Sequence, residues 1–226
     1  MTMEITVPIV QRRRLDEDIV EITCQLDGNE FPFKSGQHVH VVLPFLSFSD
    51  PKGKMRTFNI LSSPNNTEYI SFSFVNSDSG FKKTLSSLSI DSKILLKGPF
   101  GMFTLPEDNS ELILISEGIG VVPFIGMILY MTEESCTNKI TLIHSGKKSI
   151  PYIDDLNTLK KINKNLIVHT NTDGINASLI KNNVTNFNDK LFYVAGNSKT
   201  ISTVKPIILK QNVSINNLKT EEFSGY

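Results

Sequence analysis

Cysteine is scarce in this sequence, which has two, Cys24 and Cys136, among 226 residues. Two thiols are too few for a disulfide framework and too few for an iron–sulfur cluster held by four thiolates. Neither has a neighbouring histidine that would activate it as a nucleophile. Such sparse cysteine fits an intracellular, reducing environment best.

Net charge is also lacking, because 23 Lys and Arg balance 23 Asp and Glu. The whole molecule therefore has no field that favours nucleic acid or an acidic membrane surface, and we expect no nucleic-acid partner. The longest apolar run, residues 118–131, is shorter than the roughly 18 residues typical of a membrane span, and it predicts a buried helix. The N-terminal residues contain no apolar secretory core, so a cytoplasmic location is expected.

Strand-like sequence dominates the first half of the chain. Six segments are rich in Ile, Val, Phe and Thr, turn clusters separate them, and several alternate apolar with polar residues. Six short strands in this arrangement favour an antiparallel β-barrel. Residues 79–88 have apolar residues at helical spacing instead. The expected strands are residues 5–10, 19–26, 38–43, 57–61, 69–75 and 93–97.

After residue 103, strand-like and helix-like segments alternate. Such alternation predicts a parallel sheet wrapped by helices, with ligands at the carboxyl ends of the strands. The change of pattern gives two expected domains, residues 1–106 and 107–226. Pro206 is expected to kink or split the last helix. The expected strands are residues 112–115, 139–144, 166–170, 190–194 and 217–222, and the expected helices are residues 123–134, 152–162, 177–182 and 199–212.

Residues 111–131 have the pattern of a strand, a glycine turn and a helix. Gly118 and Gly120 follow a short apolar run, and Pro123 opens a second run of helical length. Glycines at such a turn let backbone N–H groups approach a phosphate, toward which the helix dipole also points. The dinucleotide fingerprint would need glycine at position 123, so an ordinary α/β connection is the commoner explanation of this segment alone.

Two further segments could carry chemistry. On a strand, Arg56 and Phe58 would share one face, and Thr57 and Asn59 would share the other. From these residues alone, a surface arginine beside a core phenylalanine is the favoured interpretation. Residues 80–84 form a glycine-led helix start with a hydroxyl and two ammonium groups, and a solvated first turn is the alternative. Two histidines at positions 38 and 40 have metal-like spacing, but no further Cys or His cluster supports them, so we expect surface positions and no metal site.

Six short motifs stand in a definite order along residues 35–226. Ser-Gly-Gln at residues 35–37, Arg-Thr-Phe-Asn at 56–59 and Lys-Gly-Pro-Phe-Gly at 97–101 lie in the first half. The second half contains Glu-Gly-Ile-Gly-Val-Val-Pro at 117–123, Ala-Gly-Asn at 195–197 and an aromatic ending at 220–226. In this order they resemble the motifs of the ferredoxin–NADP reductase family of flavoproteins. The resemblance implies an FAD-binding β-barrel of Greek-key type, followed by an α/β domain that binds NAD(P).

The resemblance also implies roles in the first domain. Arg56 would pair with the FAD pyrophosphate, because the guanidinium fork matches phosphate oxygens. Phe58 would pack on the isoalloxazine, whose polar edge near N5 would be hydrogen-bonded by Thr57 and by Asn59, which is assigned a catalytic role. The implied FAD contacts are Arg56, Thr57, Phe58, Asn59, Phe74, Val75, Gly80, Phe81, Lys82 and Thr84.

In the second domain the resemblance implies a site for NADPH or NADH. Phe223 or Tyr226 would cover the second flavin face until nicotinamide displaces it, and Tyr226 is assigned a catalytic role. Lysines at positions 147 and 148 slightly favour NADPH, although a solvated loop explains them about as well. The implied nucleotide contacts are Gly118, Gly120, Val121, Pro123, Gly196 and Asn197.

Three departures from the family pattern qualify these roles. Asn59 replaces a hydroxyl residue, Glu117 brings a carboxylate beside a phosphate site in place of glycine, and Asn197 replaces a proline. The implied function is an FAD-dependent NAD(P)H oxidoreductase. Its acceptor would be a separate ferredoxin-like protein or a small molecule, because the chain lacks the cysteines of a fused ferredoxin. The alternatives are a flavin-binding electron-transfer or regulatory subunit with weak or no nicotinamide turnover, and a nucleotide-binding module without a redox role.

Overall fold

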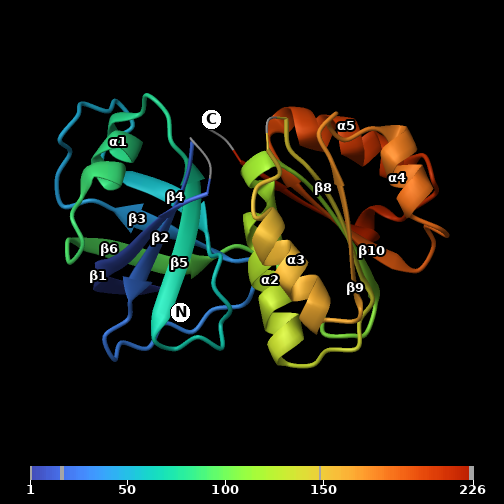
Figure 1. Cartoon of the computed structure of the whole chain (residues 1–226), viewed down its shortest axis with the longest axis horizontal. Helices are drawn as coiled ribbons and strands as arrows, with labels where there is room; N and C mark the ends of the chain where they lie inside the picture. Colours follow the sequence, from blue (N-terminus) through green and yellow to red (C-terminus); the bar gives the residue numbers. More distant parts are fainter. Residues whose placement is uncertain (1, 16–17, 148, 224–226) are drawn as a thin grey trace. The chain divides into compact units, whose positions relative to one another are not determined.

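The protein is described by a computed structural model that covers residues 2–15, 18–147 and 149–223. The chain divides at residue 105 into two units, Met1–Leu105 and Pro106–Tyr226, called unit 1 and unit 2 below (Figure 1).

Unit 1 is a six-stranded antiparallel sheet that curls into a nearly closed barrel. The strand order is β4-β3-β6-β1-β2-β5, and an antiparallel bridge between Ile60 and Phe72 joins the two edges. Because β6 returns beside β3, strands β3 to β6 form a Greek key. The expected barrel is therefore confirmed. Its strands are β1 (Met3–Arg14), β2 (Ile19–Gln25), β3 (His38–Val42), β4 (Met55–Asn59), β5 (Tyr69–Val75) and β6 (Lys93–Phe100).

Alternation along the strands builds the barrel core, as the period of two requires. Phe58 and Phe72 face inward from β4 and β5, with ring centroids 5.1 Å apart. The helix α1 (Gly80–Ser87) adds Phe81 and Leu85 to the same cluster. The Ser79 side chain caps this helix by accepting a hydrogen bond from Lys82 N. Core packing thus holds the start of α1 in a fixed position on the barrel.

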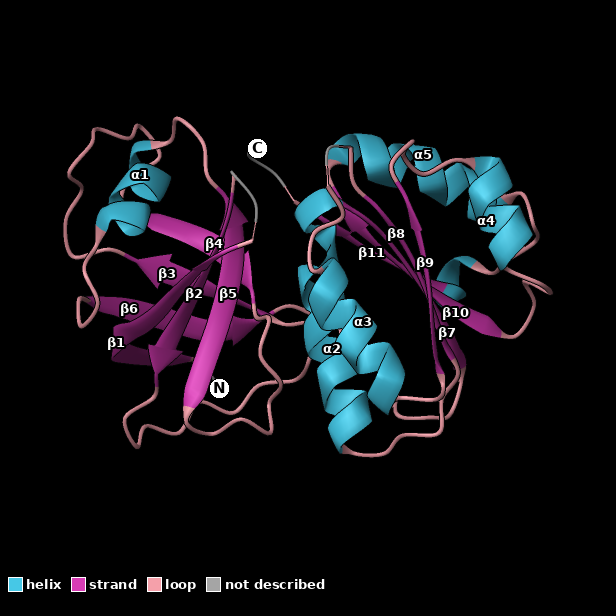
Figure 2. Cartoon of the chain, viewed as in Figure 1, coloured by secondary structure: helices cyan, strands magenta, loops and turns pink. Residues whose placement is uncertain are grey.

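Unit 2 is a five-stranded parallel sheet in the order β11-β10-β7-β8-β9. Helices α2 and α3 lie on one face of the sheet, and α4 and α5 lie on the other (Figure 2). The expected α/β domain is therefore confirmed. Its strands are β7 (Glu111–Glu117), β8 (Ile140–Ser145), β9 (Leu166–Asn171), β10 (Lys190–Gly196) and β11 (Leu218–Glu222). Its helices are η1 (Gly118–Val121), α2 (Val122–Glu133), α3 (Ile153–Ile162), α4 (Ala177–Asn183), α5 (Ser198–Leu209) and η2 (Ile215–Asn217).

Two helices of unit 2 bear on sequence expectations. The helix α2 is buried along most of its length, as its apolar run predicts. The helix α5 continues through Pro206, so the expectation of a split is wrong. Pro206 lies in the last turn, where the missing N–H removes one hydrogen bond near the end of the helix. None of the helices in the described part of the chain has both the length and the hydropathy needed to cross a membrane.

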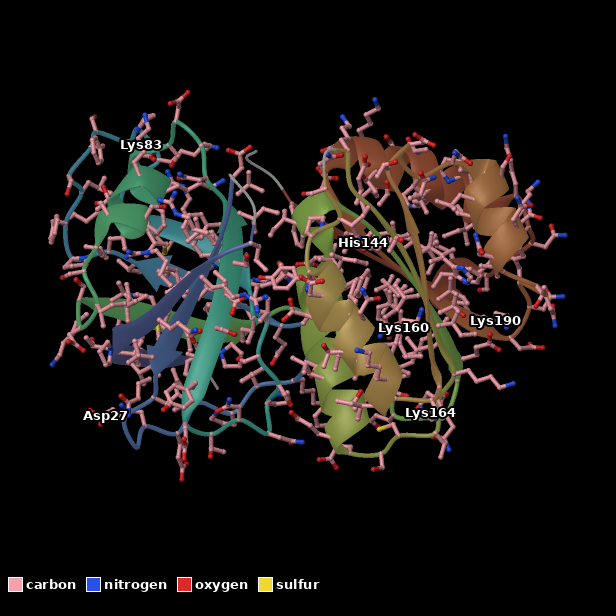
Figure 3. The ribbon with its side chains drawn as sticks, in the orientation of Figure 1. Asp27, Lys83, His144, Lys160, Lys164 and Lys190 are labelled. Carbon is pink, nitrogen blue, oxygen red and sulfur yellow. The ribbon has the colours of Figure 1, made fainter. Side chains whose placement is uncertain are left out.

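A buried histidine links β7, β8 and the chain that follows β8. His144 is fully buried in unit 2 (Figure 3). Its Nε2 lies 3.1 Å from the Pro151 carbonyl oxygen and its Nδ1 lies 3.0 Å from Ser116 Oγ. A neutral ring satisfies both contacts if Nε2 donates and Nδ1 accepts. Burial lowers the pKa of His144 to about 4, although the backbone carbonyl oxygens of Ser116 and Pro151, which can accept hydrogen bonds from the protonated ring, oppose the shift.

This lowered pKa makes the free energy of unfolding depend on pH. Below the ordinary pKa of 6.5, unfolded chains bind a proton that the folded chain binds only near pH 4, so acid favours unfolding. The loss between these pH values should reach about 3 kcal/mol. Urea unfolding at pH 7.5 and pH 4.5 should show that His144→Gln removes most of this difference. The half-buried His169, changed to Gln, should remove much less, and equal effects of the two changes would contradict the assignment.

Candidate functional site

Gln37 brings the three motifs of unit 1 together. Its carbonyl oxygen accepts a hydrogen bond from Ile60 N at 3.0 Å, just after the Arg-Thr-Phe-Asn motif. Its side-chain Nε2 donates to the Gly101 carbonyl oxygen at 3.1 Å, at the end of the Lys-Gly-Pro-Phe-Gly motif. Segments far apart in sequence therefore meet at one end of β3.

The face of β4 that points away from the barrel core carries polar and aromatic side chains. Thr57 is exposed and pairs with His40 on β3, while Asn59 pairs with His38. The Phe100 ring lies 4.5 Å from the His40 ring and 6.0 Å from the His38 ring, measured between centroids. The pKa of His38 is lowered by burial and then by the positive charge of His40. Sequence reasoning assigned these histidines to the surface, but the structure places them half-buried against Phe100. The pairing of β3 with β6, which sequence spacing does not reveal, causes the difference.

Asn59 has a side chain that suits a bound acceptor. The residue is 7% exposed, and its Nδ2 has no hydrogen-bond partner among the residues that the structure describes. An unpaired buried amide costs about 1 to 3 kcal/mol, which a ligand acceptor would offset. The amide is therefore a suitable donor to the polar edge of a flavin, the role that the family resemblance implies for this position.

The other aromatic residues expected to contact flavin belong to the barrel core. Phe58 is buried against Phe72, and Phe74 lies in the same cluster with its ring 5.6 Å from that of Phe58. Val75 is half-buried at the end of β5, where it pairs with Ile19. The structure thus shows the core phenylalanine that the sequence offered as an alternative, and flavin contacts of these residues stay predictions.

Arg56 and the start of α1 meet at a single carboxylate. The Asp50 side chain is 3% exposed and forms an ion pair with Arg56. Its Oδ2 also accepts hydrogen bonds from Phe81 N at 2.9 Å and from Ser79 Oγ at 2.7 Å. These hydrogen bonds, the Phe81 amide first, hold the pKa of Asp50 well below its usual range. Guanidinium, helix amide and hydroxyl together form an anion site, called the anion seat below.

The anion seat has excess positive charge around it. The Arg56 guanidinium carbon lies 5.1 Å from the centre of the Phe81 ring, and Lys82 is buried on the first turn of α1. Burial lowers the pKa of Lys82, and the positive charges of Arg56 and Lys52 lower it further. Thr84 is also buried, and its hydroxyl donates to the Gly80 carbonyl oxygen at 2.7 Å. The residues expected to bind phosphate are thus brought together, and the carboxylate bound there shows that their donors suit an anion.

In unit 2 the two glycine turns touch at the carboxyl ends of β7 and β10. A Cβ atom on Gly120 would lie 2.3 Å from the Ala195 carbonyl oxygen and 3.0 Å from the Gly196 Cα. Gly118 has open space around it but a φ of +59°, which favours glycine. Val121 and Pro123 are buried at the start of α2. The first turn therefore needs its glycines for backbone geometry and close packing, whether or not a nucleotide binds.

Glu117 points toward the first turn of α5. Its Oε2 lies 2.8 Å from Thr200 Oγ1, and the Thr200 amide donates to Asn197 Oδ1 at 3.0 Å. Asn197 is thus the N-cap of α5. The carboxylate therefore lies between the end of β7 and the start of α5, where the sequence places nucleotide contacts, and it would repel a phosphate bound beside it.

Two other expected contacts of unit 2, Phe223 and Lys147, lie among the described residues. Phe223 is half-buried, and its amide donates to the Gly196 carbonyl oxygen at 2.9 Å. Lys147 is exposed after β8. Tyr226 and Lys148 lie outside the described residues, so their expected roles stay predictions.

Comparison with known proteins places this geometry in a structural class. The chain superimposes on the cytochrome P450 reductase GcoB of Amycolatopsis with a TM-score of 0.84 and 14% identity, over 98% of this chain and 70% of that one. It superimposes on the ferredoxin–NADP+ reductase of Plasmodium falciparum with a TM-score of 0.80 and 18% identity, over 97% and 96% of the two chains. The expected fold is confirmed: the chain has the two-domain fold of ferredoxin–NADP reductase-like proteins.

Sequence comparison gives a relative of low identity. The chain is 23% identical over 214 residues to flavohemoprotein A of Dictyostelium discoideum, an alignment that covers 83% of this chain and 52% of that protein. The chain thus spans about half the length of this curated relative. No family model matches the sequence.

The contact between the glycine turns gives a stability prediction. In Gly120→Ala the new methyl group would overlap a backbone oxygen, so the free energy of unfolding should fall by about 1 to 3 kcal/mol. In Gly118→Ala only the left-handed backbone conformation is penalised, and the loss should be about 1 kcal/mol. Urea denaturation of both variants measures the difference. A Gly120→Ala variant as stable as Gly118→Ala would contradict the close packing of the turns.

Proposed function

We propose that the chain is an FAD-dependent NAD(P)H oxidoreductase in which unit 1 binds FAD and unit 2 binds the nicotinamide nucleotide. The observation that carries the proposal is the anion seat, where Arg56 and the start of α1 converge on one bound carboxylate. This donor set matches a phosphate, and it lies on the two segments that the family resemblance assigns to the FAD pyrophosphate. The fold comparison supports the same assignment.

The side chains of unit 1 would divide the work of holding FAD. Arg56, Lys82 and the Phe81 amide would bind and neutralise its pyrophosphate. The Asn59 amide would donate to an acceptor on the edge of the flavin, and Thr57 lies exposed on the same strand face. When bound, FAD supplies the exchange between hydride transfer and single-electron transfer, and the protein supplies binding and alignment.

Unit 2 would hold the nucleotide at the carboxyl edge of its sheet. The η1 turn and the Ala-Gly-Asn turn lie against each other there, as the contact of Gly120 with Ala195 shows. We propose that Phe223, which is fixed beside Gly196, belongs to this nucleotide site. Hydride transfer needs reacting atoms aligned at about 3 to 3.5 Å, so positioning is the main contribution expected of these residues.

The proposed acceptor is a separate protein of the ferredoxin type or a small molecule. This proposal rests on the family resemblance.

An absorbance spectrum tests the flavin half of the proposal. Purified protein should show flavin bands, either as isolated or after FAD is added. Anaerobic titration with NADPH and NADH in parallel should then bleach the bands, and the nucleotide that acts at the lower concentration is the preferred donor. Protein that stays colourless with FAD would overturn flavin binding. Flavin bands that neither nucleotide bleaches would overturn the proposed reductase activity but not the proposed flavin binding.

Glu117 supports a second candidate, a flavin-binding electron-transfer or regulatory subunit with weak nicotinamide turnover. Its carboxylate is held by Thr200 and faces the proposed phosphate site. Two like charges a few ångströms apart repel by about 1 kcal/mol even in a solvated site. Weak nucleotide binding would follow if this charge persists when the nucleotide approaches.

The change Glu117→Gln tests this candidate, because it removes the charge and keeps an oxygen for the Thr200 hydroxyl. Nucleotide affinity should rise several-fold, as measured by the concentration that half-bleaches the flavin or by direct calorimetry. Glu134→Gln is a matched control, since this exposed carboxylate lies at the opposite end of α2. Unchanged affinity in Glu117→Gln would count against a repulsive role for this residue.

A further inference from the structure

The anion seat is occupied by the chain itself. Asp50 comes from the loop between β3 and β4, residues 43–54, called the β3–β4 loop below. Its carboxylate takes the hydrogen bonds of Phe81 N and Ser79 Oγ and the charge of Arg56. These are groups that unit 1 would offer to a phosphate.

The rest of the loop covers the first turn of α1. The carbonyl oxygens of Phe48 and Ser49 approach Gly80 so closely that a Cβ atom there would lie 2.5 Å and 2.3 Å from them. The Ser47 amide donates to Thr84 Oγ1 at 3.0 Å. Of the expected phosphate contacts, Phe81 and Thr84 are therefore hydrogen-bonded to loop atoms, and Gly80 is covered by the loop backbone.

Polar contacts rather than core packing hold much of this loop. Leu43 lies in the barrel core and Leu46 packs against it, whereas Phe45 and Phe48 are 51% and 48% exposed. The loop also closes on itself, because Asp50 Oδ1 accepts from Lys52 N at 2.9 Å and Lys54 Nζ donates to the Pro44 carbonyl oxygen at 2.8 Å. Residues 47–54, which are exposed or half-buried, have little buried apolar surface, and such a segment can leave its place at low cost while the core stays intact.

Arg56 is bound by the same loop on its other side. Its Nη1 lies 3.0 Å from the Lys52 carbonyl oxygen and 3.1 Å from that of Gly53. Most of the guanidinium is therefore committed to loop atoms. A cofactor phosphate can therefore bind the Arg56 guanidinium only if it displaces the loop atoms that are bound to it.

We propose that the β3–β4 loop is a displaceable plug, in which Asp50 occupies the anion seat in place of the FAD pyrophosphate. The inference rests on the proposed function and adds a mechanism by which flavin affinity is set. Before Arg56 and α1 can hold FAD, the loop must leave the seat. The apparent affinity is then the intrinsic affinity multiplied by the fraction of molecules with an open seat. Lys82 and the freed Arg56 would attract the pyrophosphate, which carries more negative charge than the carboxylate it replaces.

The change Asp50→Asn tests the plug, because an amide has nearly the same shape and lacks the charge. Flavin-free protein titrated with FAD should bind at least about tenfold more tightly than wild type, since charged hydrogen bonds no longer hold the seat closed. Inorganic pyrophosphate should raise the melting temperature of Asp50→Asn more than that of wild type. Asp27→Asn is the matched control: Asp27 is exposed on unit 1, at the end of the barrel opposite Lys83 of α1, and asparagine tolerates its positive φ (Figure 3). Equal or weaker FAD binding by Asp50→Asn would overturn the plug and show that Asp50 positions Arg56 for the cofactor.

Hydrogen exchange of the wild-type protein gives a second test that needs no variant. On addition of FAD, the Ser47 amide of the β3–β4 loop should exchange at least about tenfold faster, because it loses its hydrogen bond to Thr84 of α1. If FAD binds and the exchange rate of this loop amide falls or stays the same, the plug is overturned but the proposed function is not. If neither wild type nor Asp50→Asn binds FAD, both proposals fail.

Discussion

A single carboxylate fixes three segments of unit 1 relative to one another. Asp50 joins the β3–β4 loop to Arg56 of β4 and to the first turn of α1. Each partner alone is an ordinary feature: an arginine on a strand, a helix start with a serine cap. Their convergence is what defines a place for negative charge, because a guanidinium and a helix N-terminus reinforce each other only when they face the same point.

The fold followed from the sequence because its signals are local and agree with one another. Alternation in residues 69–75 and the apolar run at 112–115 specify strands, and the change from the first pattern to the second marks two kinds of sheet. The prediction that Pro206 splits the last helix was wrong because the effect of a proline depends on its position in the helix. That position depends on where α5 ends, which no single residue specifies. Of the candidate site, the sequence predicted that Arg56 and residues 80–84 belong to one site, through the order of motifs and not through chemistry at either place.

The rest of the site depends on contacts between segments distant in sequence. Nothing around Asp50 in the sequence marks it as a ligand of Arg56, since Asp-Pro-Lys-Gly at residues 50–53 is an ordinary turn signal. The half-buried places of His38 and His40 depend on how β3 pairs with β6. The orientation of Glu117 depends on Thr200, 83 positions away along the chain. Such pairings are set by sheet topology and turn geometry together, and no short window of sequence contains both.

The barrel closes at one seam. Beside the Ile60–Phe72 bridge, the Leu61 amide donates to the Ser71 carbonyl oxygen at 2.8 Å. These contacts join β4 and β5, which are the two edge strands of the sheet. The strand at this seam is the one that bears Arg56 and Asn59. A ligand that binds those two side chains would therefore also stabilise the junction between β4 and β5, where few backbone hydrogen bonds are formed. Binding of such a ligand and stability of the barrel are then thermodynamically linked, so that binding raises the free energy of unfolding of unit 1.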